Sequence, residues 1–177
     1  LEPQMLMSIR TLNLDEVNKL GEGVKAIALP DERWDKVDIK TTNLIPNILA
    51  QTKAEKKFAY TAMLFRDGIC TEGATSNVFA VKDGILYTHP ADNHILKGIT
   101  RQMIVTRVAP SLGITLIEKE FDRAFVDDAD ELFFTDTIGG VIPIIKLDKN
   151  PVSGGKPGHV TLRLREALEK LMEEGLP

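Results

Sequence analysis

Apolar residues recur along the chain with two different periods, and these periods predict the secondary structure. Short runs rich in branched and aromatic side chains are typical of β-strands, whereas apolar positions three and four residues apart are typical of helices. The pattern predicts strands at residues 24–29, 60–65, 77–81, 85–88, 114–117, 131–135 and 141–145. It predicts helices at residues 12–20, 42–57, 100–109 and 159–173.

Turn residues indicate how these elements connect. Asp83-Gly84 between two apolar runs is a strong hairpin signal. We expect the polar run 41–43 to cap the helix that follows it, Pro110 to end the helix before it, and residues 150–158 to form a surface loop. Because strands alternate with helices while hairpins are mixed in, we predict an α/β fold whose mixed sheet partly curls into a barrel-like core with flanking helices.

Composition and charge narrow the class of protein. The 177 residues make one domain at roughly 100–200 residues each, and 43% hydrophobic with 27% charged residues excludes a wholly disordered chain. The net charge of −4 disfavours a nucleic-acid partner, and no apolar run approaches the roughly 18–20 residues that span a bilayer. The one cysteine, Cys70, fits a reducing compartment. We therefore expect a cytoplasmic protein with neither nucleic acid nor membrane as partner.

Four features could carry chemistry, and each also has an ordinary structural explanation. Lys40 is an amine before a helix start, although most lysines are only solvated. Glu72 lies in a small polar run between strands, either as a loop residue or as a carboxylate beside a ligand. Gly98 precedes a helix whose N–H groups favour an anion, and it also fits a simple turn. The hydroxyls and glycines of residues 135–140 fit a phosphate or a tight turn.

Taken together, these features fit one cofactor. A lysine for covalent attachment, a carboxylate for a pyridine nitrogen and donors for a phosphate are what pyridoxal 5′-phosphate requires. The spacing alone leaves open whether they meet in space.

Several motifs resemble the fold-type IV pyridoxal-phosphate enzymes, which include D-amino-acid aminotransferases, branched-chain aminotransferases and aminodeoxychorismate lyases. The motifs stand in the family's order between about Gly23 and about Arg165, and the closest resemblance is to the D-amino-acid aminotransferase branch. They are Asp38-Ile39-Lys40, Thr71-Glu72-Gly73, Ser76-Asn77-Val78-Phe79, Asp83-Gly84-Ile85-Leu86-Tyr87-Thr88-His89-Pro90 and Leu96-Lys97-Gly98-Ile99-Thr100-Arg101.

The resemblance implies a role for each matching residue. Lys40 matches the lysine that binds the cofactor covalently and carries the proton. Glu72 matches the glutamate that pairs with the pyridine nitrogen, and Leu96 matches the apolar residue packed on the ring. Ile99 and Thr100 match the helix start that binds the phosphate.

The later loop and one arginine complete the implied site. Thr137 matches a phosphate-binding hydroxyl with Asp136 beside it, an odd neighbour for a phosphate unless its side chain points away. Arg33 matches an arginine of the D-amino-acid branch with a supporting role. Ile138 and Gly139 are expected near the substrate, and no metal ligand is implied.

Two comparisons separate the branches of the family. Branched-chain aminotransferases carry a tyrosine five positions after the lysine, whereas this chain has Ile45 there, and Asn43-Leu44 resembles the D-amino-acid branch. Against this, Gly139-Gly140 before Val-Ile-Pro resembles (R)-selective amine transaminases. The resemblance therefore favours transamination between a D-amino acid, such as D-alanine, and a 2-oxo acid. A branched-chain aminotransferase, an aminodeoxychorismate lyase, an (R)-amine transaminase and a non-catalytic binding domain remain alternatives.

The family also has a smaller N-terminal domain that nothing in residues 1–22 resembles. We expect residues 1–22 to be a linker or remnant after that domain and residues 23–177 to be the large, cofactor-binding domain. On this interpretation the isolated fragment is inactive. The resemblance further implies a homodimer.

Overall fold

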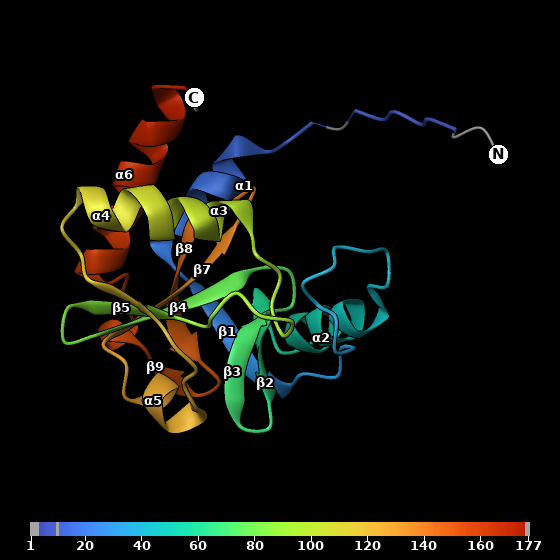
Figure 1. Cartoon of the computed structure of the whole chain (residues 1–177), viewed down its shortest axis with the longest axis horizontal. Coiled ribbons are helices and arrows are strands. Elements are labelled where there is room, and N and C mark those ends of the chain that lie inside the picture. Colours follow the sequence, from blue (N-terminus) through green and yellow to red (C-terminus); the bar gives the residue numbers. More distant parts are fainter. Residues whose placement is uncertain (1–3, 10, 176–177) are drawn as a thin grey trace.

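The computed structural model describes residues 4–9 and 11–175 and has one mixed sheet at its centre (Figure 1). The strands run in the order β3-β2-β1-β8-β7-β4-β5-β6, with β9 paired to β8. Pairs β1–β2, β1–β8 and β5–β6 are parallel and the other pairs are antiparallel. The strands are β1 Val24–Pro30, β2 Thr61–Arg66, β3 Ile69–Gly73, β4 Asn77–Lys82, β5 Ile85–Thr88, β6 Leu116–Glu118, β7 Glu131–Asp136, β8 Gly140–Leu147 and β9 Asn150–Pro151.

Helices flank this sheet. The first, α1 Leu14–Lys19, precedes β1, and α2 Ile45–Glu55 precedes β2. Helix α3 Ile99–Met103 continues through a π-helical segment, Ile104–Val108, into α4 Ala109–Ser111. The chain also forms α5 Arg123–Asp127 and α6 His159–Glu173. No helix within the described ranges is long and apolar enough to cross a membrane.

A short connection forces the sheet to curl. Strands β3 and β4 have four strands between them in the sheet, so in a flat sheet they would lie about 24 Å apart at roughly 4.8 Å per step. Only residues 74–76 join them, and that length of chain reaches at most about 14 Å. The backbone N–H of Gly73 even donates to the carbonyl of Ser76 across this connection. The predicted barrel-like curl is therefore confirmed.

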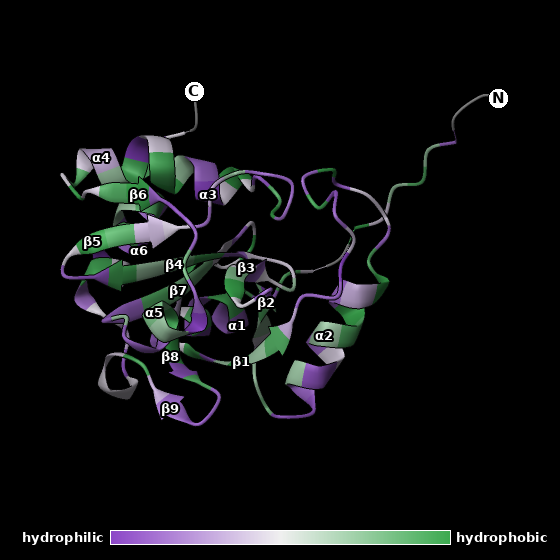
Figure 2. Cartoon of the chain, turned by 60° about the horizontal axis from the view of Figure 1, so that its bottom comes forward, coloured by the Kyte–Doolittle hydropathy of each residue, from purple (hydrophilic) through white to green (hydrophobic). Residues whose placement is uncertain are grey.

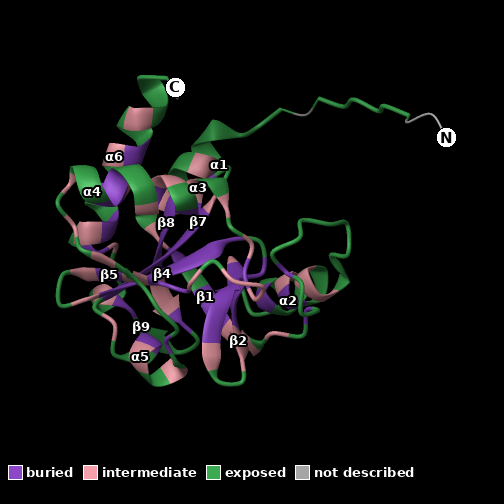
Figure 3. Cartoon of the chain, in the orientation of Figure 1, coloured by how far each residue is buried: buried purple, intermediate pink, exposed green. Residues whose placement is uncertain are grey.

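Side chains on the two faces of the sheet fill separate cores. Successive strand residues point to opposite faces of the sheet. Val78 and Ala80 therefore join one hydrophobic cluster inside the curl, to which side chains of β1, β2, β3, β4, β7 and β8 contribute. Phe79 and Val81 join a second cluster under α3, α4 and α6. A third cluster lies between α2 and its neighbouring strands. Most residues of the central strands are buried (Figure 3), whereas the helices mix hydrophilic and hydrophobic residues (Figure 2).

Glu131 at the start of β7 caps the last long helix. Its carboxylate accepts the backbone N–H of Val160 at 3.0 Å and both the N–H and hydroxyl of Thr161 at 2.7 Å. The first N–H groups of a helix have no acceptor within it, so a buried carboxylate from the sheet satisfies them. Strand β7 thus holds α6 at one end and, as shown below, enters the candidate site at the other.

Three expectations about local structure were wrong. Residues 69–73 form strand β3, so Glu72 lies on a strand rather than in a polar loop. The polar side chains of this strand are buried because residues distant in sequence form hydrogen bonds with them. The helix at 100–109 passes Pro110 and ends at Ser111, since the preceding π-helical segment widens the turn where the ring must fit. Helix α2 begins at Ile45 with Leu44 as its cap residue, so the run 41–43 does not cap it.

Helix α2 also presents its apolar side differently from the sequence pattern. Ile45, Ile48 and Leu49 are 69%, 59% and 51% exposed, while the helix packs on the sheet through Ala50 and Ala54. Small residues allow the helix to approach the strands closely. The periodicity found the helix correctly, but it did not find the face that is buried in this chain.

Candidate active site

One cavity of about 350 Å³ brings together most of the residues that the sequence singled out. It opens between the loop before α2, the ends of β3 and β7, and the start of α3. Eight of the ten predicted site residues line it: Arg33, Lys40, Glu72, Leu96, Ile99, Thr100, Asp136 and Thr137. Ile138 and Gly139 do not. Lys40 and Glu72, 32 positions apart in sequence, therefore face the same cavity.

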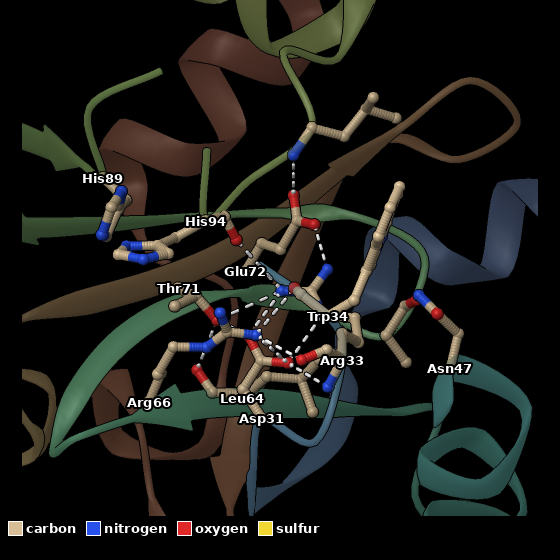
Figure 4. Close-up of polar contacts among 12 residues, drawn as sticks. Asp31, Arg33, Trp34, Asn47, Leu64, Arg66, Thr71, Glu72, His89 and His94 are labelled. Carbon is tan, nitrogen blue, oxygen red and sulfur yellow. Dashed lines mark hydrogen bonds and ion pairs between the residues drawn. The ribbon is translucent and has the colours of Figure 1, made fainter. Parts of the chain in front are cut away.

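Glu72 is the buried acidic group of this cavity, with 5% of its surface exposed. One carboxylate oxygen accepts from Nη1 of Arg33 (Figure 4). The other accepts from Nδ2 of Asn77 at 2.8 Å and from the backbone N–H of Leu96 at 3.1 Å. A carboxylate offers about four acceptor sites, so these three donors leave one. Glu72 can thus accept one further hydrogen bond from a ligand.

Burial dominates the electrostatics of Glu72. Removal from water raises the pKa of its carboxyl to about 7, although Arg33 and the N–H of Leu96 oppose that rise. Burial also tends to lower the pKa of the Arg33 guanidinium, but its bonds to Asp31 and Glu72 outweigh this and raise that pKa. A cationic ligand beside Glu72 would favour the ionised carboxylate further.

Arg33 lies behind Glu72 in a rigid set of bonds. Its Nε and Nη2 each bond the Asp31 carboxylate at 2.8 Å, and Nη2 lies 3.3 Å from the carbonyl oxygen of His94 (Figure 4). Planar guanidinium–carboxylate pairs of this kind fix geometry as well as charge. The structure therefore places Arg33 where it orients Glu72.

Lys40 lies at the mouth of the cavity, exposed, in the loop between β1 and α2. Ile99 and Thr100 at the start of α3 also line the cavity, and their backbone N–H groups have no acceptor within the helix. The Thr100 hydroxyl donates to the carbonyl of Asp136 at 2.9 Å and joins the helix start to the loop that carries Thr137. This part of the cavity can receive an anion.

Asp136 resolves the electrostatic oddity noted in the sequence. Its Oδ1 accepts the backbone N–H groups of Ile138 at 2.9 Å and Gly139 at 2.6 Å, while Oδ2 accepts the hydroxyl of Tyr60 at 3.3 Å. Burial, together with the nearby Asp136 charge, raises the pKa of Tyr60. The carboxylate therefore shapes the turn that carries Thr137. The N–H groups of Ile138 and Gly139 are already bonded within that turn.

Unpartnered hydroxyls provide an independent test of whether a polar ligand fits. The hydroxyls of Ser76 and Thr135 are buried, line the cavity and have no hydrogen-bond partner among the described residues. Buried polar atoms usually find a partner. A basic amine, a carboxylate with one free acceptor site, a helix start and two free hydroxyls together fit the functional groups of pyridoxal phosphate.

The sequence placed Ser76 and Asn77 in a motif and Thr135 among the hydroxyls of residues 135–140, but it gave none of the three an individual role. Ser76 directly precedes β4, Asn77 begins it, and Thr135 lies near the end of β7. Membership of these runs at strand ends was the available signal.

The family profile described as "Amino-transferase class IV" matches residues 1–147, so the chain belongs to the class IV aminotransferase family. The resemblance proposed from the motifs is thereby confirmed. Among curated relatives, it is 42% identical over 154 residues to a D-alanine aminotransferase of Staphylococcus aureus (strain COL), covering 87% of this chain and 54% of that protein. It is 40% identical over 147 residues to a D-alanine aminotransferase of Bacillus licheniformis, covering 83% of this chain and 52% of that one.

Solved structures confirm the fold. A branched-chain aminotransferase of Thermoproteus uzoniensis with norvaline aligns at TM-score 0.79 and 31% identity, over 85% of this chain and 52% of that one. An aminotransferase from Brucella abortus bound to the cofactor PLP aligns at TM-score 0.75 and 26% identity, over 85% and 55% of the two chains. The chain thus spans about half the length of the relatives it matches.

Proposed function

We propose that this chain is the pyridoxal-phosphate-binding domain, residues 23–177, of an enzyme that transfers an amino group between a D-amino acid, such as D-alanine, and a 2-oxo acid. The observation that carries the proposal is the buried Glu72 carboxylate with one free acceptor site, in the same cavity as the amine of Lys40. The identity to D-alanine aminotransferases supports the D-amino-acid branch.

The cofactor, when bound, supplies the electron sink for the carbanion that forms at the substrate. Glu72 as a carboxylate would hold a proton on the ring nitrogen through its fourth acceptor site. Arg33 keeps that carboxylate oriented, and Leu96 packs against the ring. The helix start at Ile99 and Thr100, together with the hydroxyl of Thr137, binds the phosphate.

Lys40 performs both attachment and proton movement. Its Nζ would hold the cofactor covalently and would be released by an incoming substrate amine. The free Nζ would then be the base that takes the proton from Cα of the substrate and the acid that delivers it on the cofactor side of the substrate nitrogen. Its place at the cavity mouth leaves it accessible to an incoming amine.

Substrate choice is tested on the complete protein that the gene encodes. We expect amino transfer from D-alanine to 2-oxoglutarate, together with an absorption band of bound cofactor, and we expect both to disappear in Lys40→Ala. Activity only with branched-chain L-amino acids, with an (R)-amine, or in cleaving aminodeoxychorismate would favour the corresponding alternative. Cofactor binding without turnover of any of these would indicate a non-catalytic binding domain.

The proposal extends to assembly and place. By analogy with the family we propose a cytoplasmic homodimer, with residues 1–22 leading from a smaller N-terminal domain. Exposed apolar residues on α2 are compatible with a further protein surface covering them. Light scattering on the complete protein tests the dimer, and a monomer at high concentration would contradict it.

A further inference from the structure

Asn77 occupies a central position in the site. It is the first residue of β4, 4% exposed, and it lines the cavity directly beside Glu72. Neither the cofactor nor the substrate needs to touch it for it to matter, because its amide bonds to two other parts of the site.

The Asn77 amide has a single permitted orientation. Its Nδ2 donates to Glu72 at 2.8 Å and to the carbonyl of Leu96 at 2.8 Å. Both partners are acceptors, so turning the amide would place its oxygen against two oxygens and lose both bonds. The NH₂ group is therefore fixed, and both of its hydrogens are used.

The Asn77 oxygen lies against a third part of the site. A methyl group at Gly98 would overlap Oδ1 of Asn77, so the residue before α3 lies directly against this amide. Gly98 has an ordinary φ of −62° and needs no glycine for its backbone conformation. The absence of a side chain there serves the contact with Asn77.

We infer that Asn77 is a positioning residue that holds Glu72, the Leu96 segment and the start of α3 in register. It thereby couples the end of the cavity that receives the pyridine nitrogen to the end that receives the phosphate. Donation to Glu72 also stabilises the ionised carboxylate, which keeps the proton on the ring nitrogen rather than on Glu72. This inference rests on the proposed function.

The test uses the complete protein loaded with pyridoxal phosphate carrying ¹⁵N in its ring, because the ¹⁵N chemical shift reports whether that nitrogen is protonated. In Asn77→Leu, which keeps the branched arrangement of heavy atoms and has no donor, we expect the signal to move toward the neutral ring. We expect kcat to fall about tenfold with a smaller change in KM, since about 1.4 kcal/mol of transition-state stabilisation is a factor of ten. The acid limb of the kcat profile should move to higher pH.

Asn47→Leu is the matched control. Asn47 is another asparagine lining the cavity, but its Nδ2 donates to the carbonyl of Ala74 at 2.7 Å rather than to Glu72. We expect its ring-nitrogen signal to match the wild type. Thermal unfolding of every variant separates loss of fold from loss of positioning.

Asn77→Ser decides the matter if the leucine variant does not fold. Its hydroxyl carries a single hydrogen and lies one bond nearer the backbone than the Asn77 amide nitrogen, so the bond to Glu72 is lost and the ¹⁵N signal should again move toward the neutral ring. A folded Asn77→Ser protein with the wild-type signal and pH profile would overturn the inference alone. A wild-type protein that takes up no cofactor would overturn the proposed function, and the inference with it.

Discussion

Asp136 provides a sharp test because two substitutions should change cofactor affinity in opposite directions. Asp136→Asn removes the negative charge but keeps an oxygen at Oδ1, so the bonds from Ile138 and Gly139 can persist. Its amide can still reach the hydroxyl of Tyr60. Asp136→Ala removes the charge and all three bonds.

The dimensions of the cavity set the magnitude of the repulsion between Asp136 and a bound phosphate. A volume of about 350 Å³ corresponds to a sphere about 9 Å across. A phosphate carrying about two negative charges within this distance of Asp136 is repelled by roughly 1 kcal/mol at the dielectric constant of water. Removing that repulsion should tighten binding about fivefold, because each 1.4 kcal/mol is a factor of ten. In the alanine variant, loss of the turn that carries Thr137 should outweigh this gain and weaken binding about tenfold.

The assay is an absorbance titration of the cofactor-free complete protein with pyridoxal phosphate at low and high salt. The gain in Asp136→Asn should shrink at high salt, since added ions screen charges this far apart. Equal weakening in both variants would refute the reasoning. It would instead support direct binding of the cofactor by Asp136.

Four further outcomes follow from the same contacts. Glu72→Gln should lose at least about tenfold in turnover while the protein stays yellow, because a neutral amide holds the ring proton less strongly; full activity would remove Glu72 from the site. Burial raises the pKa of Glu72 to about 7, so the folded cofactor-free protein binds a proton that the unfolded chain has released. The bound proton contributes fully to stability at pH values below the ordinary pKa of a glutamate. This contribution is lost as pH rises through about 7. The difference in urea-unfolding free energy between wild type and Glu72→Gln should therefore vary over that range, and a constant difference would contradict the shift. Gly98→Ala should weaken cofactor binding several-fold through displacement of Asn77, and an unchanged titration would argue against their contact. Glu131→Ala leaves the N–H groups of Val160 and Thr161 unsatisfied and should cost about 2–4 kcal/mol of stability, which a thermal melt with no shift would contradict.

The sheet was largely predictable because most of its strands have a clear local sequence pattern. Asp83-Gly84 marks the β4–β5 turn, and the apolar run of β7 needs no distant partner to be recognised. Strand β3 was not predictable in the same way. Thr71 and Glu72 have the polarity of solvent-facing residues. Their burial is tolerated because other segments supply hydrogen-bond partners, among them Asp31 for Thr71, and Arg33, Asn77 and the Leu96 N–H for Glu72.

The candidate site likewise has residues that a local motif identifies and residues whose role depends on contacts between distant segments. Lys40, Glu72 and Thr137 could be named from motifs, but spacing along the chain did not show that they meet. Asn77 could not be given a role, because that role lies in bonds to Glu72 and Leu96 that depend on the curl of the sheet. The role of Asp136 likewise depends on turn bonds that form only in the folded chain.

The strand order has a consequence for how the chain acquires its fold during synthesis. Strand β1 lies beside β8, with Val24 paired to Ile144. At roughly 5–20 residues per second, a ribosome needs on the order of ten seconds to deliver that partner after β1 has emerged. Throughout this interval the backbone N–H and C=O groups on that edge of β1 have no partner strand, a condition that favours association between nascent chains. Because β7 and its following turn also arrive late, a phosphate ligand can stabilise only the finished sheet, not the early pairing of β1 with β2.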